Sequence, residues 1–447
     1  MAYHDSVMCR WYAPDGPVFC STTNRKERED VSNFKLAGFA GFALAGLLTI
    51  AARGDTIEFL NDRTLEGKVV RRTADSVILS TPSGAGSVEA TIPTARIHAL
   101  VVAGQRSVLH EKPTRASIEA LIQKAGTTPP DWWNAVPLEY PPTLDLTWPV
   151  PKPKSPWDAN RNVGQYVWSV INENPGKWRS GARLLHHLLT VNQTNAPALD
   201  RTMGALATVY MNLLQDWPRA AFWYRKALVT SPKDELRHVR LAECYWRLGS
   251  KALTLEELAK VDEYVSVDIV KLWAEMGDLE RALAEAESLA AEDREEVGWL
   301  AAGDACRLNG DYKRALQFYQ QVQASDTSEK WVARYKERAQ ANIAAMQAFN
   351  LLDLAHTPDG TYTGSSISYT GPLEVAVDVK QGKILAVRVT KHTDKQYYTA
   401  LTETPRKIVE RQSLKGIDAV TSATVTCDAI VNATAKALAT ASKPAAP

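Results

Sequence analysis

The residues best suited to chemistry stand together near the C-terminus, in a short run that leads into a predicted helix. Asp418, Thr421, Ser422, Ala423 and Thr424 supply one carboxylate and three hydroxyl groups within seven positions. Thr424 is expected at the start of the helix, where backbone N–H groups have no carbonyl partner and the helix dipole favours an anion. A phosphate ester on the Thr424 hydroxyl would therefore meet a phosphate-binding site that is already formed.

An ordinary capping role stays open for the same residues. Serine and threonine are preferred N-cap residues because the side-chain oxygen accepts a hydrogen bond from a free N–H group. Thr421, Ser422 or Thr424 would then cap the helix predicted over about residues 427–438. Small side chains at Ser422 and Ala423 would also leave room for a bulky cofactor. The elements upstream help to choose between the two roles.

A β-hairpin is predicted upstream of this run. After Leu354 the apolar pattern changes from a period of 3.6 to a period of 2, which is typical of strands. Residues 373–380 and 383–390 alternate cleanly, and Gln381-Gly382 forms a two-residue turn between them. A loop and then a helix over 397–412, interrupted by a proline, complete the segment.

Three ordered patterns in this region resemble the FMN-binding domain found in subunits of the sodium-pumping NADH:quinone reductase and of the Rnf complex. The resemblance covers about residues 357–440, a fifth of the chain. The matching residues are Asp359, Gly360, Tyr362 and Gly364 for the D-G-x-Y-x-G opening, Lys380, Gly382, Lys383 and Ile384 for the K-x-G-K-I turn, and Asp418, Thr421, Ala423 and Thr424 for the D-x-x-[ST]-G-A-[TS] motif.

The resemblance implies a covalently bound FMN. In the family, the last threonine of the motif is esterified to the FMN phosphate by a separate flavin transferase of the ApbE type, and that residue is Thr424 here. The predicted cofactor-binding residues are therefore Thr424, Asp418, Thr421, Ser422 and Ala423, and the resemblance supplies no catalytic residue and no metal ligand. It also implies that the domain passes electrons.

One motif position departs from the family pattern, because Ser422 stands where a glycine is usual. Glycine suits a backbone with positive φ, or a close approach by the transferase. Serine is small and can meet the second need. His392, in the loop after the hairpin, is within possible reach of a flavin ring, although a lone loop histidine is more often only solvated.

Helical repeats are predicted over residues 159–350. The run that begins Gly277-Asp278 recurs 33 residues later at Gly310-Asp311, and a third copy begins at Asp216. This offset is close to the 34-residue tetratricopeptide period, which predicts three to four repeats. Such a stack is expected to dock redox partner proteins, and a purely structural spacer is the alternative.

The segments before the repeats have simpler patterns. Residues 54–104 alternate as five short strands separated by turn residues, which predicts a small closed barrel resembling Sm-like or SH3-like barrels. Residues 105–158 are predicted to be a helix and an extended linker with nine prolines between Pro129 and Pro156. Tryptophans in the linker, including Trp133 and Trp148, predict that it docks on a neighbour.

An apolar segment of seventeen residues without a charge, 36–52, follows a leader with three basic residues at 25–28. As a helix it would extend about 26 Å at about 1.5 Å per residue, slightly less than the bilayer core. Basic charge before it predicts a cytoplasmic N-terminus and an exported remainder. It is either an uncleaved anchor or a signal peptide cut near Ala51 or Ala52. A buried helix of a soluble domain is the third possibility.

Composition excludes several other classes of protein. Hydrophobic residues make up 45% and charged residues 23%, enough for several folded domains. The net charge is +1 without a basic stripe, which argues against nucleic-acid binding. None of the five cysteines forms a C-x-x-C pair, and Cys244 and Cys306 are expected in the core.

The sequence therefore predicts an exported, extracytoplasmic, membrane-anchored electron-transfer flavoprotein, an electron carrier or a subunit of an oxidoreductase complex. The competing interpretation is a non-redox repeat scaffold of the cell envelope that binds no flavin. The predicted fold is multidomain, and its parts are a cytoplasmic leader (1–34), a transmembrane anchor or signal peptide (35–53), an all-β barrel (54–104), a helix and proline-rich linker (105–158), an all-α tetratricopeptide-like solenoid (159–350), an α+β FMN-binding domain (356–440) and a tail (441–447).

Overall fold

The computed structural model describes most of the chain after residue 53. The described residues are 54–60, 64–83, 86–152, 155–292, 295–326, 330–349, 352–420 and 422–441. The predicted leader and apolar segment lie outside them, as does Thr421. Among the helices of the described part, none combines the length and the apolar character needed to cross a membrane.

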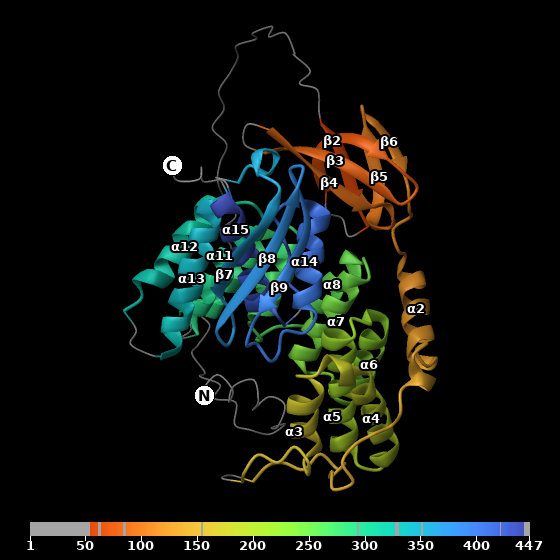
Figure 1. The fold of residues 1–447 in the computed structure, drawn as a ribbon. Coiled ribbons are helices and arrows are strands. Elements are labelled where there is room, and N and C mark those ends of the chain that lie inside the picture. Colours follow the sequence, from red (N-terminus) through yellow and green to blue (C-terminus); the bar gives the residue numbers. More distant parts are fainter. Residues whose placement is uncertain are drawn as a thin grey trace, which may run out of the picture. The chain divides into compact units, whose positions relative to one another are not determined.

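The N-terminal strands form one antiparallel sheet with the order β4-β3-β2-β1-β5-β6 (Figure 1). Its strands are β1 (Asp55–Phe59), β2 (Thr64–Arg72), β3 (Ser76–Ser83), β4 (Gly86–Pro93), β5 (Ile97–Val102) and β6 (Gln105–Val108). The side chains of Ile57, Leu79, Ile92 and Ile97 pack together in its core. The five predicted strands are confirmed as β1 to β5.

Two details of the barrel prediction are wrong. A sixth strand, β6, follows β5 and belongs to the sheet, whereas the sequence placed residues 105–108 in the linker. Strand β5 pairs with β1 on one side and with β6 on the other. Both edges of β5 are therefore occupied, so it cannot close a barrel against β4 by backbone hydrogen bonds. In the described residues the ladder order has two ends.

The proline-rich linker docks on the helices that follow it, as its tryptophans predicted. After α2 (Arg115–Thr127) the chain runs without long regular elements. The Trp148 side chain is only 7% exposed, and its indole N–H donates to the Thr202 hydroxyl at 2.8 Å. Trp133 packs edge-on against His186, with ring centroids 5.0 Å apart. These contacts fix an otherwise extended segment.

The middle of the chain is helical throughout, and successive helices pack side by side (Figure 1). Its helices are α3 (Val163–Tyr166), α4 (Trp178–Val191), α5 (Ala196–Thr208), α6 (Trp217–Thr230), α7 (Glu235–Arg247), α8 (Lys251–Leu258), α9 (Val267–Glu275), α10 (Leu279–Ala291), α11 (Glu295–Leu308), α12 (Tyr312–Ala324) and α13 (Lys330–Phe349). We call this set the helical array.

The recurring Gly-Asp pairs have a structural explanation. Gly277 and Gly310 have φ of 78° and 80°, which ends one helix in the left-handed region that glycine tolerates. Asp278 and Asp311 follow and accept a backbone hydrogen bond as the N-caps of α10 and α12. Each pair is thus a sharp turn between two antiparallel helices. The structure shows helix pairs, and their membership of the tetratricopeptide class stays a prediction.

The C-terminal part contains a three-stranded sheet, β7-β8-β9, and two helices. Helix α15 packs on β7 and β8, and α14 packs on β9 (Figure 1). The bounds are β7 (Gly360–Ile367), β8 (Pro372–Lys380), β9 (Lys383–Lys391), α14 (Ala400–Arg411) and α15 (Thr424–Ala441). The predicted two-residue turn is confirmed, since Gln381 and Gly382 have φ of 50° and 71°.

The two predicted C-terminal helices need correction at their bounds. Helix α14 begins at residue 400 rather than 397 and continues through Pro405, which is buried, without interruption. Helix α15 begins at Thr424, three residues before the predicted start near Cys427. Both differences are at helix ends or at a proline, where local propensity is a poor guide to packed structure.

The C-terminal sheet and the end of the helical array share one hydrophobic core, so no boundary in packing falls near residue 350. A buried polar network crosses it. The Arg307 guanidinium of α11 donates to the Asn342 and Asn432 side-chain oxygens, at 3.0 Å in both cases. Arg338 of α13 contacts Asp428 of α15 at 2.8 Å. Helix α15 is therefore held by α11 and α13 as well as by its own sheet.

Gly364 in β7 tests this packing. A Cβ atom there would lie 2.2 Å from the Ala433 carbonyl oxygen of α15. We expect Gly364→Ala to lower the free energy of unfolding by about 2 kcal/mol, because a packed helix cannot yield by that distance without strain. Gly360→Ala is the control in the same motif, since its Cβ would meet nothing closer than 3.4 Å. Urea unfolding of both variants measures the difference, and equal stabilities would contradict the close approach.

Candidate functional site

Thr424 is the first residue of α15 and is half-buried. The Cys427 N–H donates to the Ala423 carbonyl oxygen at 3.0 Å, which makes Ala423 the residue before the first turn. The N–H groups of Thr424, Val425 and Thr426 consequently have no acceptor within the helix. The hydroxyl-bearing residue thus stands at an N-terminus with free donors, as the sequence predicted, and such an end favours a phosphate.

Ser422 occupies the backbone conformation that the missing glycine would favour. Its φ is 60°, inside the left-handed region. A non-glycine residue in this region is strained by about 1–2 kcal/mol. The positive φ anticipated for this motif position is therefore present, and serine adopts it at a cost in stability.

Ala423 and Cys427 anchor the motif to the core. Both are buried and pack with Ala400 and Val420. The Cys427 sulfur accepts hydrogen bonds from the Val420 N–H and the Thr404 hydroxyl, both at 3.2 Å. Burial raises the pKa of the Cys427 thiol above its usual value. The only cysteine near Thr424 among the described residues is therefore a packing residue rather than a nucleophile.

Asp418 ties the motif to α14 and to the helical array. Its carboxylate lies 2.9 Å from the Lys407 ammonium and 3.6 Å from the Arg247 guanidinium of α7. Arg411 approaches at 3.6 Å. Lys407 also donates to the Asp418 carbonyl oxygen at 3.0 Å. The carboxylate is thus a structural tether of the loop, a role that the sequence pattern did not specify.

Asp394 is the important residue that the sequence analysis passed over. It is 4% exposed, and its carboxylate accepts from the Thr370 N–H at 2.8 Å and from the Thr426 hydroxyl at 2.7 Å. The Ser368 and Thr370 hydroxyls also donate to it. It therefore joins the β7–β8 loop, the β9–α14 loop and the first turn of α15. A carboxylate among hydroxyl residues was visible in the sequence, but its partners are distant in the chain.

The loops around the start of α15 also contact the helical array. The Gln215 amide donates to the Thr399 hydroxyl. Asn172 hydrogen-bonds the half-buried Tyr398. The Arg334 guanidinium of α13 donates to the Tyr369 carbonyl oxygen at 2.9 Å. The candidate site therefore lies where the C-terminal domain meets the array.

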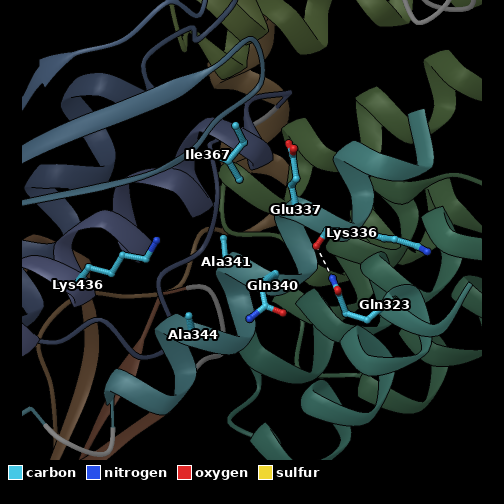
Figure 2. Close-up of a pocket in the computed structure, with 8 residues that line it drawn as sticks. All are labelled: Gln323, Lys336, Glu337, Gln340, Ala341, Ala344, Ile367 and Lys436. Carbon is cyan, nitrogen blue, oxygen red and sulfur yellow. Dashed lines mark hydrogen bonds between the residues drawn. The ribbon is translucent and has the colours of Figure 1, made fainter. Parts of the chain in front are cut away.

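Two hollows adjoin this domain away from Thr424. One, of about 430 Å³, lies between α13 and α15, and Figure 2 shows Lys436 pointing into it toward Gln340 and Ala341. Lys436 is twelve residues beyond Thr424, about 18 Å along the helix. The other, of about 600 Å³, is lined by Asp418 and by residues of the N-terminal sheet such as Phe59. Thr424 lines neither hollow.

Residues 368–439 match the family model of the FMN-binding domain. The C-terminal domain is an FMN-binding domain. The match includes the hairpin, Asp394, the motif and α15, whereas the D-G-x-Y-x-G opening lies before it. The recognition of this family and of its cofactor from the sequence is confirmed.

An uncharacterized protein of Treponema pallidum (strain Nichols) is 32% identical over 109 residues, which are 24% of this chain and 30% of that protein. The chain thus spans less than a third of that relative's length. No solved structure matches the chain.

The residues present fit an FMN group. The phosphate would meet the free N–H groups at the start of α15, and the half-buried Thr424 keeps part of its surface accessible. In the loop between β9 and α14, the Nδ1 atom of His392 is buried and has no hydrogen-bond partner. A buried polar atom of this kind usually has a hydrogen-bond partner, and a bound ligand could supply one for Nδ1.

Ser422→Gly tests the backbone strain. Glycine adopts φ of 60° freely, so the variant should gain about 1 kcal/mol in stability, the strain relieved less the entropy that glycine loses on folding. Ala419→Gly, in the same loop and without positive φ, is the control and should lose stability. Chemical denaturation of both proteins decides, and a loss of stability in Ser422→Gly would refute the strain.

Asp394→Ala tests the central acceptor. Removing the carboxylate leaves the hydroxyls of Ser368 and Thr426 buried without an acceptor, which should destabilise the protein by about 3 kcal/mol. The matched control is Asp378→Ala. Like Asp394, Asp378 accepts a hydrogen bond from a threonine hydroxyl, but it lies at the surface, where it also pairs with Arg388. Its replacement should cost about 1 kcal/mol or less. Thermal unfolding of the two variants should therefore differ clearly.

Proposed function

We propose that this chain is an extracytoplasmic electron-transfer flavoprotein that carries FMN covalently on Thr424. The observation that carries the proposal is the place of Thr424, which is the first residue of α15 inside an FMN-binding domain. It is the one motif hydroxyl whose own N–H group belongs to the free donors of that helix end among the described residues.

The attachment is a phosphoryl transfer without redox change. The Thr424 oxygen forms a bond to the phosphorus of an activated flavin phosphate, and the bond from phosphorus to its leaving group breaks. The hydroxyl proton passes to a base of the transferase, the enzyme that catalyses the transfer. An ApbE-type flavin transferase is the enzyme class that the motif implies as partner.

The protein's own residues then hold and orient the cofactor. The N–H groups of the first turn neutralise the phosphodiester, and the helix dipole adds to this. Asp394 and Asp418 fix the two flanking loops through their partners on other elements. The flavin supplies reversible one- or two-electron transfer, and the protein tunes its potential.

The proposed location and the proposed partner proteins are inferred from the segments outside the FMN-binding domain. The apolar segment 36–52 would anchor the protein in the cytoplasmic membrane, with the remainder on the extracytoplasmic side. A covalent bond suits that location, since free FMN outside the cytosol would be lost. Redox partner proteins would dock on the faces of the helical array that the FMN-binding domain leaves open. Without flavin, the chain would instead be a scaffold of the envelope.

Replacement of Thr424 tests the attachment. The full chain is coexpressed with a flavin transferase, denatured in acid and separated by electrophoresis. Wild type and Thr424→Ser should keep fluorescence on the polypeptide, because both retain the hydroxyl. Thr424→Val should lose it entirely. Mass spectrometry should find FMN less one water on the peptide that contains Thr424.

Thr402→Val is the control, because Thr402 is a surface hydroxyl at the start of α14 in the same domain. This variant should be labelled as wild type is. If Thr424→Val still carries covalent flavin, the attachment is at another residue. A wild-type chain without covalent flavin, although folded and coexpressed with the transferase, would favour the scaffold.

A further inference from the structure

His392 directly follows β9 and begins the loop that frames the start of α15. Two residues later the Asp394 carboxylate accepts a hydrogen bond from the Thr426 hydroxyl of the first helical turn, at 2.7 Å. Two residues of chain span at most about 7 Å. Thr426 is in turn only two residues, about 3 Å of rise, from Thr424. His392 therefore belongs to the loop that Asp394 fixes to the first turn of α15, the turn that begins at Thr424.

The imidazole ring of His392 is held by packing, but one of its nitrogens lacks a hydrogen-bond partner. Its ring packs edge-on against Tyr397, with centroids 5.0 Å apart and planes inclined by 77°. The Nδ1 atom is buried and makes no hydrogen bond. A buried ring nitrogen without a partner is unfavourable in a folded protein, so its retention needs a reason. Tyr397 contributes a ring face and leaves Nδ1 unpaired.

The other buried unpaired atoms of the described residues have different surroundings. Arg240 and Arg338 each have a carboxylate partner through another nitrogen. Ser366 lies within β7, and Asn212 lies in the helical turn Val209–Leu213 of the array. His392 alone among these residues belongs to a loop at the mouth of α15. Its unpaired atom is thus at the side of the domain where the cofactor is expected.

We propose that His392 holds the isoalloxazine ring of the FMN on Thr424 by donating a hydrogen bond from Nδ1; this inference rests on the proposed covalent attachment. The flavin ring presents carbonyl oxygens and ring nitrogens as acceptors, and an imidazole N–H matches them. The phosphate has its donors in the helix, so the histidine is left for the ring. His392 is a cofactor-contacting residue.

The expected effect is on the redox potential of the bound flavin. Reduction places additional electron density on the ring acceptors, and a hydrogen-bond donor stabilises that density. Loss of the donor should shift the midpoint potential to a more negative value. Covalent loading should not change, because Thr424 and the first turn of α15 are intact.

Two substitutions separate the ring nitrogens. In His392→Asn the amide nitrogen comes near the former Nδ1 position, whereas in His392→Gln it comes near the Nε2 position. The full chain is loaded by coexpression with the transferase, and the flavin potential and absorption spectrum are measured. His392→Asn should retain the wild-type values, and His392→Gln should have the more negative potential and an altered spectrum. His356→Gln is the control, because that side chain is 78% exposed and bound to Asp353.

The outcomes distinguish this inference from the proposed function. Wild type without covalent flavin contradicts the attachment itself. A wild-type level of flavin with the same potential and spectrum in His392→Gln overturns the role of His392 and leaves the attachment intact. If His392→Gln does not fold, the flavin potentials of His392→Asn and His392→Leu are compared instead. Only His392→Asn keeps a donor near the Nδ1 position, so only His392→Leu should have the more negative potential.

Discussion

The packing of α15 is the constraint on which the site depends. This helix is buried along most of its length, between β7 and β8 on one side and α13 on another. Small residues make this possible, because Gly364 allows the strand backbone to approach the helix closely. Arg307 and Arg338 fix its rotation through Asn432 and Asp428. A helix held on all sides presents its N-terminus, and thus Thr424, in one position.

Two carboxylates position the loops around that N-terminus by different physical means. Asp394 is buried and accepts hydrogen bonds from neutral donors of two other segments, the β7–β8 loop and the first turn of α15. Asp418 is paired with cations of α14 and α7 and so works through charge. Hydrogen bonds weaken steeply as their angle changes, whereas the attraction between charges depends on distance alone. The first turn of α15, which Asp394 holds, is therefore placed more rigidly than the preceding loop, which Asp418 holds.

The helical array has a role that its sequence pattern did not suggest. Repeats of this type are expected to present a surface to other proteins. Here α7, α11 and α13 contact the FMN-binding domain of the same chain, through Arg247, Arg307 and Arg338. The shared core makes array and domain one structural unit. If the proposed electron-transfer role holds, a redox partner would have to approach the flavin past the array or through it.

Local sequence determined the elements and the family. Period-2 alternation, the Gln381-Gly382 turn and the Gly-Asp pairs specify strands, hairpin and helix turns through backbone preferences that act over a few residues. The motif itself placed Thr424 at a helix start. Tertiary structure alone decided the rest: which residues donate hydrogen bonds to Asp394, and that β6 pairs with the edge of β5 that does not face β1. Those outcomes depend on partners distant in the chain, and spacing in one sequence carries no record of such pairings.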